Sequence, residues 1–313
     1  MEKNSRFNYV AGERWFPLET SFTEDLPKYW GDWGCSSEFE KLKAVLLRRP
    51  GKEVDNFDWK KARFMEKVDP ELLRKQHDAM AQIYRDHGVE IYYVEDQRED
   101  RPNALFMRDQ VFMTPEGAII TRLGMDQRRG EERYASKALG NIGVPIVRTI
   151  SGDGIFEGAN AMWIDRKNVI LSTGSRANPS GVAQMEFELK RMGVENILYM
   201  QIPYGHAHID GILNIASEDT AMIYSPQVPY DVVDGLKRLG YKILECPSMK
   251  EAKESFAINF VAIDSGKIIQ PAGNPQSKEL LEKNGIEVIS VDFSEIVKGW
   301  GAVHCCTAFL KRG

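Results

Sequence analysis

The chain has 313 residues, of which 42% are hydrophobic and 28% are charged, and its formal net charge is −5 with a pI near 5.7. This profile is typical of a soluble globular protein and gives no reason to expect a nucleic-acid or membrane partner. No run is long and apolar enough to predict a membrane span, and the N-terminus lacks the apolar core of a signal peptide, so we expect a cytoplasmic protein.

Residues 1–36 precede the repeated part of the chain and are rich in aromatic side chains. Such a segment can be a strap whose rings pack on the body of the protein, or a lid over a functional site. We expect the strap, with residues 37–313 forming a single domain.

One pattern recurs five times along residues 37–313: an amphipathic stretch ends in a glycine and leads directly into a β-branched or aromatic run. The five glycines are Gly88, Gly143, Gly193, Gly240 and Gly285. Each fits the position just after a helix, where a left-handed backbone costs glycine nothing, and the run behind it predicts a buried strand.

Two short strands around a polar turn are predicted upstream of four of these helices, in "VFMTPEGAIITR", "AMWIDRKNVILS", "LNIASEDTAMIYS" and "VAIDSGKIIQP". The first copy has only "LKAVLLRRPG" at this place. The repeated unit is therefore strand, strand, helix, strand. Five copies followed by a C-terminal strand, "HCCTAFLK", favour an α/β fold closed into a ring, and an ordinary α/β sandwich is the alternative.

Histidine is scarce and unevenly placed. His77 and His87 fall in the first predicted helix among charged neighbours, so we expect them on the surface. His206, His208 and His304 lie in motifs at the starts of repeat elements.

The stretch "GHAHIDG" at 205–211 resembles the metal-binding signature of metallo-β-lactamases, which would make ligands of His206, His208 and Asp210. That signature needs a further histidine where Gly211 stands, so we expect no metal. A buried histidine tied to a carboxylate is another possible interpretation.

Cysteine chemistry is the alternative that we favour, with His208 as the acid/base of a nucleophilic thiol. Asp109 in "FMRDQVF", Glu157 in "IFEGAN" and Cys305 also begin a repeat element or its closing strand. In a closed ring these starts converge near the axis. Several acids around one thiol suit a cationic, planar substrate.

The motifs "FMRDQ", "FEGAN", "HIDG" and "GAVHCCT", in this order, resemble those of the guanidine-modifying enzymes: arginine and agmatine deiminases, dimethylarginine dimethylaminohydrolases and amidinotransferases. The resemblance covers about residues 37–313. It implies the pentein fold, an α/β propeller of five ββαβ-type units around a pseudo-fivefold axis with the active site in the central channel.

Carried over to this chain, the resemblance makes Cys305 the nucleophile and His208 the general acid/base, with Glu157 orienting the histidine. Asp109 and Asp210 would hold the guanidinium nitrogens. Cys306 would point to the opposite face of the same strand, into packing.

The resemblance also implies contacts to the rest of the substrate. Arg176 in "STGSRAN" matches a residue that contacts the substrate carboxylate in arginine deiminases, and Arg128 or Arg129 would be a second contact. Asn160 and His304 are also expected to contact the substrate, and both depart from the arginine deiminase pattern. "EGAN" replaces the E-G-G-D of arginine deiminases, and His304 precedes the cysteine, as in agmatine and peptidyl deiminases, where arginine deiminases commonly have arginine.

We therefore expect a hydrolase that acts on a free arginine-like guanidino compound through a covalent S-amidino-cysteine intermediate, with no cofactor or metal. An amidinotransferase with an amine acceptor, a dimethylarginine dimethylaminohydrolase-type activity and an inactive ring protein are the alternatives. The expected partner is a small guanidino molecule, and assembly into a homo-oligomer stays open.

Overall fold

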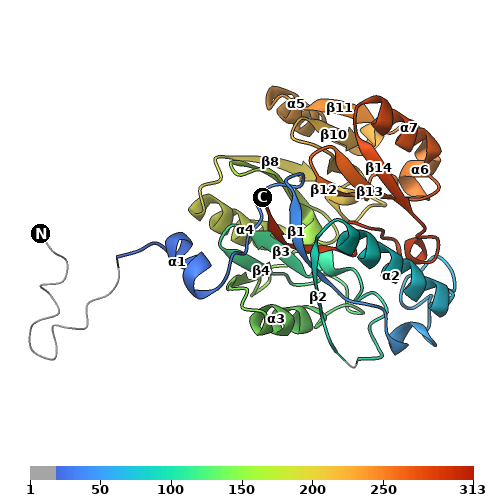
Figure 1. Ribbon diagram of the computed structural model, residues 1–313, viewed down its shortest axis with the longest axis horizontal. Coiled ribbons are helices and arrows are strands. Elements are labelled where there is room, and N and C mark those ends of the chain that lie inside the picture. Colours follow the sequence, from blue (N-terminus) through green and yellow to red (C-terminus); the bar gives the residue numbers. More distant parts are fainter. Residues whose placement is uncertain (1–18, 97) are drawn as a thin grey trace, which may run out of the picture.

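Five three-stranded sheets organise the computed structural model, which describes residues 19–96 and 98–313 (Figure 1). In each sheet the middle strand has one antiparallel and one parallel neighbour. Four sheets are built from consecutive strands: β3 (Val111–Thr114), β4 (Gly117–Ile120), β5 (Ile146–Thr149); β6 (Ala161–Asp165), β7 (Asn168–Thr173), β8 (Asn196–Gln201); β9 (Leu213–Ile215), β10 (Thr220–Ile223), β11 (Lys242–Glu245); and β12 (Val261–Asp264), β13 (Lys267–Pro271), β14 (Glu287–Val291).

A helix connects the middle strand to its parallel neighbour in each of these sheets, because two parallel strands cannot be joined by a tight turn. These helices are α3 (Glu132–Asn141), α4 (Pro179–Arg191), α5 (Tyr230–Arg238) and α7 (Pro275–Lys283), and a short α6 (Met249–Lys253) precedes the last sheet. The predicted unit of strand, strand, helix and strand is therefore confirmed.

The first sheet draws on both ends of the chain. Its middle strand is β1 (Leu42–Leu47), which runs through α2 (Pro70–Asp86) into the parallel strand β2 (Glu90–Tyr93). The C-terminal strand β15 (Ala308–Arg312) pairs antiparallel with β1 and supplies the strand that the first copy lacks.

All five repeat glycines have a positive φ, between 73° and 92°. Each directly follows the C-cap residue of its helix. A side chain at such a position would bring Cβ against the backbone. The predicted helix ends are confirmed.

The prediction that His77 lies on the surface is wrong, because this residue lies on the buried face of α2. This side chain is fully buried beside Leu73, Met80 and Tyr84, and neither ring nitrogen has a hydrogen-bond partner within the described part of the chain. Burial lowers the pKa of His77 to about 4. Charged neighbours in the sequence misled the prediction because in a helix they project to the other side.

Short turns open the repeats. The 3-10 helices η4 (Met107–Asp109), η5 (Gly158–Asn160) and η6 (Ile209–Gly211) precede the first strands of three sheets, and η5 contacts both of the others. A turn at 303–306 precedes β15 in the same way. Cys305 and Cys306 therefore lie in a turn and not in a strand, contrary to the prediction.

The described part of the aromatic segment contains α1 (Phe22–Tyr29) and an extended stretch. Trp33 packs edge-on against Tyr92 at 5.6 Å between ring centroids, and the Gly34 N–H donates to the Leu310 carbonyl. Phe22, Tyr29 and Trp30 are exposed. The expectation for the earlier aromatic residues falls on residues 1–18, which lie outside the described residues.

None of the helices in residues 19–96 and 98–313 is both long enough and apolar enough to cross a membrane.

Candidate active site

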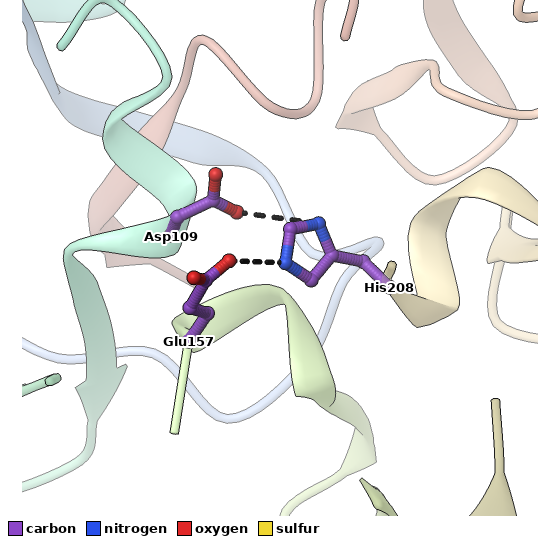
Figure 2. Close-up of side chains that lie close together, drawn as sticks. All are labelled: Asp109, Glu157 and His208. Carbon is purple, nitrogen blue, oxygen red and sulfur yellow. Dashed lines mark hydrogen bonds and ion pairs between the residues drawn. The ribbon is translucent and has the colours of Figure 1, made fainter. Parts of the chain in front are cut away.

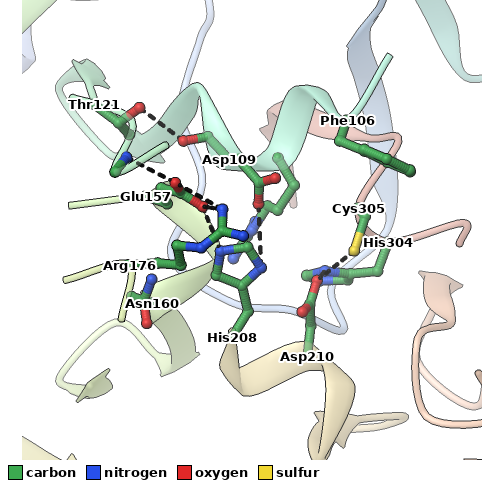
Figure 3. A network of polar contacts seen from close by, with 12 residues as sticks. Phe106, Asp109, Thr121, Glu157, Asn160, Arg176, His208, Asp210, His304 and Cys305 are labelled. Carbon is green, nitrogen blue, oxygen red and sulfur yellow. Dashed lines mark hydrogen bonds and ion pairs between the residues drawn. The ribbon is translucent and has the colours of Figure 1, made fainter. Parts of the chain in front are cut away.

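The starts of the repeats surround a cavity of about 810 Å³. Asp109, His208, Asp210 and Cys305 line it, although they come from three different parts of the chain (Figure 3). All except His208 are at most 5% exposed. The structure thus brings together the thiol, the histidine and the two carboxylates that the sequence singles out.

His208 lies between two carboxylates, as Figure 2 shows. Its Nε2 is 2.7 Å from Glu157 Oε2, and its Nδ1 is 3.6 Å from Asp109 Oδ1. Burial alone would lower the pKa of His208, but the two carboxylates outweigh burial and raise it above its ordinary value of 6.5. The two carboxylates therefore favour the protonated imidazole.

Glu157 remains ionised although it is fully buried. Burial would raise its pKa, but the bond to His208 and the charges of His208 and Arg176 lower it to about 2. Its Oε1 also accepts the Gly124 N–H at 2.8 Å. The next residue must be glycine, because a Cβ at Gly158 would lie 2.2 Å from the Arg108 carbonyl oxygen.

The arginines differ in what they offer to the cavity. Arg128 is saturated: it donates to Asp109 at 2.5 Å, to Glu131 at 2.9 Å and to two backbone carbonyls, so it positions Asp109. Arg176 lines the cavity with its side chain 20% exposed and uses only Nη1, at 3.2 Å from both Glu157 oxygens. Its remaining N–H groups have no partner within the described chain.

Cys305 has two polar neighbours. Its Sγ lies 3.4 Å from Asp210 Oδ2, to which the thiol donates, and it accepts from Asn259 Nδ2 at 3.1 Å. Burial and then the charges of Asp210 and Asp109 raise the pKa of Cys305 well above 9.0. Without a cationic ligand the thiol is therefore protonated. Cys306 is fully buried in the adjacent hydrophobic core and does not line the cavity.

Asn259 is a site residue that the sequence analysis missed. Its Oδ1 accepts the N–H groups of Ala302 and Cys305 and so fixes the turn that carries the thiol. A signal was available, since "FAIN" precedes the first strand of the fifth repeat as "FMRD" precedes that of the second.

Asp210 is held in place by a row of buried ionic side chains. His304 Nδ1 is 2.8 Å from Asp210 Oδ2, His304 Nε2 is 3.1 Å from Glu38 Oε2, and Arg108 donates to Glu38 at 2.7 Å. Burial would lower the pKa of His304, but the bonds to Asp210 and Glu38 raise it. Glu38 was also missed, because no local pattern links it to the last turn.

Three residues expected to contact the substrate do not line the cavity. His304 faces Asp210 and Glu38, Asn160 accepts from Ser172 Oγ at 2.8 Å, and Arg129 donates to the Leu123 carbonyl at 3.1 Å. Their side chains act on the protein itself. Asn160 is labelled away from the sulfur of Cys305 in Figure 3.

The ligand set that the metallo-β-lactamase signature would need, His206 with His208 and Asp210, is not among the groups whose ligand atoms lie close together in the described residues. The set whose ligand atoms lie within 4.8 Å of one another is Asp109, Glu157 and His208. Both carboxylates of that set already hold an arginine, and both imidazole nitrogens face a carboxylate, so these donors have protein partners in place.

Comparison with known families settles the group to which this arrangement belongs. The model of eukaryotic N,N-dimethylarginine dimethylhydrolases matches residues 45–312. The chain belongs to this family. It is thereby a member of the pentein superfamily of guanidine-modifying enzymes, and its relatives also include arginine deiminases.

Three similar proteins show how far the likeness extends. The uncharacterised protein YkgA of Bacillus subtilis is 28% identical over 92% of this chain and 98% of its own. The N(G),N(G)-dimethylarginine dimethylaminohydrolase of Streptomyces coelicolor is 26% identical over 79% and 89%. The structure of SxtG, an amidinotransferase from Microseira wollei, is 14% identical and superimposes with a TM-score of 0.73 over 90% of this chain and 97% of its own, which shows a shared fold.

Proposed function

We propose that this member of the dimethylarginine dimethylhydrolase family is a hydrolase that breaks a C–N bond of a free arginine-like guanidino compound through an S-amidino intermediate on Cys305. The observation that carries the proposal is the meeting of Cys305, His208, Asp109 and Asp210 on one cavity. Residues 37–313 would be the catalytic unit, with its five units arranged as a propeller around the cavity.

The guanidinium is expected between Asp109 and Asp210. Each carboxylate offers charge-assisted hydrogen bonds that fix the plane of the cation and place its central carbon near the sulfur. Arg128 and His304 hold these carboxylates from behind, so the acids are oriented before the substrate arrives.

Binding of the cation would activate the thiol. Burial and then the charges of Asp210 and Asp109 raise the pKa of Cys305, and a positive charge between the two carboxylates offsets their part, which favours transfer of the thiol proton to solvent as the substrate binds. The thiolate then adds to the guanidine carbon. Protonated His208 gives its proton to the departing nitrogen, which leaves as ammonia or an alkylamine.

The same histidine would complete the reaction. After its proton is lost, neutral His208 accepts a proton from a water that attacks the amidino carbon, and the carbon–sulfur bond breaks to release a ureido product. Glu157 keeps the ring oriented through both steps. None of these steps calls for a metal, so we expect activity to survive exhaustive chelation.

The test is substitution of the two adjacent cysteines. Cys305→Ser should lower turnover by roughly a thousandfold or more, because a serine hydroxyl is a far weaker nucleophile at neutral pH. Cys306→Ser is the matched control and should keep most of the activity. Denaturing quench followed by mass spectrometry should find the amidino adduct on Cys305; full activity in Cys305→Ser would refute the covalent mechanism.

Amidino transfer is the second candidate, because the amidinotransferase structure shares this fold. A transferase given its first substrate alone should release one leaving group per enzyme and then stop until an amine is added. A hydrolase should turn over steadily. We expect steady turnover, measured as ureido product in the absence of any acceptor.

A further inference from the structure

The mouth of the cavity differs in charge from its interior. Among the described residues that line it, the only acids are Asp109 and Asp210, and both are deeply buried near the sulfur. Two exposed cations, Arg63 and Lys253, also line the cavity. Within residues 19–96 and 98–313, neither of them forms an ion pair.

Lys253 is part of a small polar group. Burial and the Lys253 charge lower the pKa of His206, whereas its bond to Gln227 raises it, and all three residues line the cavity. The group thus offers a positive charge at the cavity.

Unusual backbone conformation is also found among the lining residues. Arg63, Phe256 and Trp300 are the only residues other than glycine with positive φ in the described chain, at 66°, 54° and 67°, and all three line the cavity. Bulky side chains rarely adopt this conformation, and such outliers concentrate at functional sites. Trp300 is 57% exposed and Tyr204 is fully exposed, so the mouth has apolar surface beside its cations.

These features bear on the part of the substrate that lies beyond its guanidinium group. A free amino acid would bring an ammonium to a mouth where the described lining residues include two cations without an ion pair and no exposed acid. A carboxylate, in contrast, would be attracted by Arg63 and Lys253. A cavity of about 810 Å³ also has the size of sites that hold ligands larger than an amino acid.

We infer that the substrate is a guanidino acid whose α-nitrogen carries no charge, in the form of an Nα-acylated arginine. Its guanidinium lies between Asp109 and Asp210, and its carboxylate faces Arg63 and Lys253. The acyl group lies against the aromatic side chains of the mouth. This inference rests on the proposed function and narrows its substrate class.

Four guanidines test it, because they vary carboxylate and ammonium independently: Nα-acetyl-L-arginine, L-arginine, N-acetylagmatine and agmatine. We expect kcat/KM for Nα-acetyl-L-arginine to exceed that for L-arginine and for N-acetylagmatine by roughly tenfold each, with agmatine poorest. A preference for L-arginine or agmatine would overturn the inference.

The cations are tested by Arg63→Gln and Lys253→Gln, with Lys61→Gln and Lys250→Gln as matched controls that lie nearby but do not line the cavity. Each test variant should raise KM for Nα-acetyl-L-arginine by about fivefold with little change in kcat, and each control should leave both constants unchanged. An unaltered ratio between Nα-acetyl-L-arginine and N-acetylagmatine in both test variants would contradict the inference.

Calorimetry on Cys305→Ala separates the two proposals, since it measures the affinity for each guanidine without turnover. The same order of Kd values supports the inference even if no guanidine is consumed. If guanidines are consumed through a Cys305 adduct but L-arginine binds best, the proposed function stands and the acylated substrate is wrong.

Discussion

At the residue scale, the protonation of the Cys305 thiol depends on its neighbours. The residue type indicates a nucleophile, but burial, Asp210 and Asp109 all disfavour the thiolate. The same two carboxylates are the expected ligands of the guanidinium. Under the proposed mechanism the thiol stays unreactive until a cationic substrate binds, which would limit alkylation and oxidation of the free protein.

Alkylation of Cys305 measures this control. In a Cys306→Ser background, iodoacetamide should react with Cys305 in proportion to the thiolate, with a midpoint well above pH 9.0. Asp210→Asn removes a negative charge beside the sulfur, which stabilises the thiolate, so the midpoint should fall by about one pH unit and the rate at pH 8 should rise about tenfold. Peptide mass spectrometry gives the rate, and an unchanged or higher midpoint would show that Asp210 does not set the thiol pKa.

At the element scale, the short turns before the first strands place the chemistry. η4 ends at Asp109, η5 directly follows Glu157, and η6 directly follows His208 and contains Asp210. The backbone is tightly packed there: a Cβ at Gly158 would meet the Arg108 carbonyl oxygen at 2.2 Å. The tightly packed backbone of these turns therefore sets the positions of Asp109, Glu157, His208 and Asp210.

Gly158→Ala should destabilise the protein by about 1–3 kcal/mol, because the backbone of η4 or η5 has to move to admit the methyl group. The same shift displaces Glu157 and Asp109, so kcat should fall by more than the loss of folded protein explains. Gly140→Ala is the control: it lies in α3 with no atom within 4 Å of a new Cβ and should stabilise by about 0.5–1 kcal/mol. Urea unfolding and steady-state kinetics measure both effects.

At the scale of the whole molecule, the two ends of the chain are joined twice. β15 completes the sheet of β1 and β2, and Glu38 bonds His304 in the turn that carries Cys305. Arg108 from the second repeat bonds the same carboxylate. Glu38, near the start of the chain, therefore links the second repeat and the C-terminal turn beside the cavity.

Glu38→Ala should lower the free energy of unfolding by about 3–5 kcal/mol, because it leaves Arg108 buried without its partner. Burial would raise the pKa of Glu38, but Arg108 and His304 lower it from 4.5 to about 2. The stability that this depression contributes, about 3 kcal/mol, is present above pH 4.5 and is lost as the pH falls towards 2.

Urea unfolding between pH 3 and pH 7 follows that loss. The difference between wild type and Glu38→Ala should shrink at low pH, whereas Glu40→Ala, at an exposed position, should change stability by less than about 0.5 kcal/mol at any pH. If the difference in free energy of unfolding between wild type and Glu38→Ala does not depend on pH, the charge of the Glu38 carboxylate does not stabilise the fold.

The amino-acid sequence by itself determined the repeated unit, its five helix-ending glycines and the set of chemical groups that meet at the cavity. These features have local periods or short motifs, and neighbouring residues specify them through backbone conformation and side-chain alternation. The residue types of the carboxylates, the histidine and the thiol are likewise readable from "FMRDQ", "FEGAN", "HIDG" and "GAVHCCT".

Tertiary structure alone decided which side chains face the cavity and which support it from behind. Asn160, His304 and Arg129 are close in sequence to cavity residues, yet the turns direct them into the protein. Glu38 reaches His304 across 266 positions, and β15 reaches β1 from the other end of the chain. Such contacts carry no local signal, because they depend on how the five sheets pack and not on the conformation of any one segment.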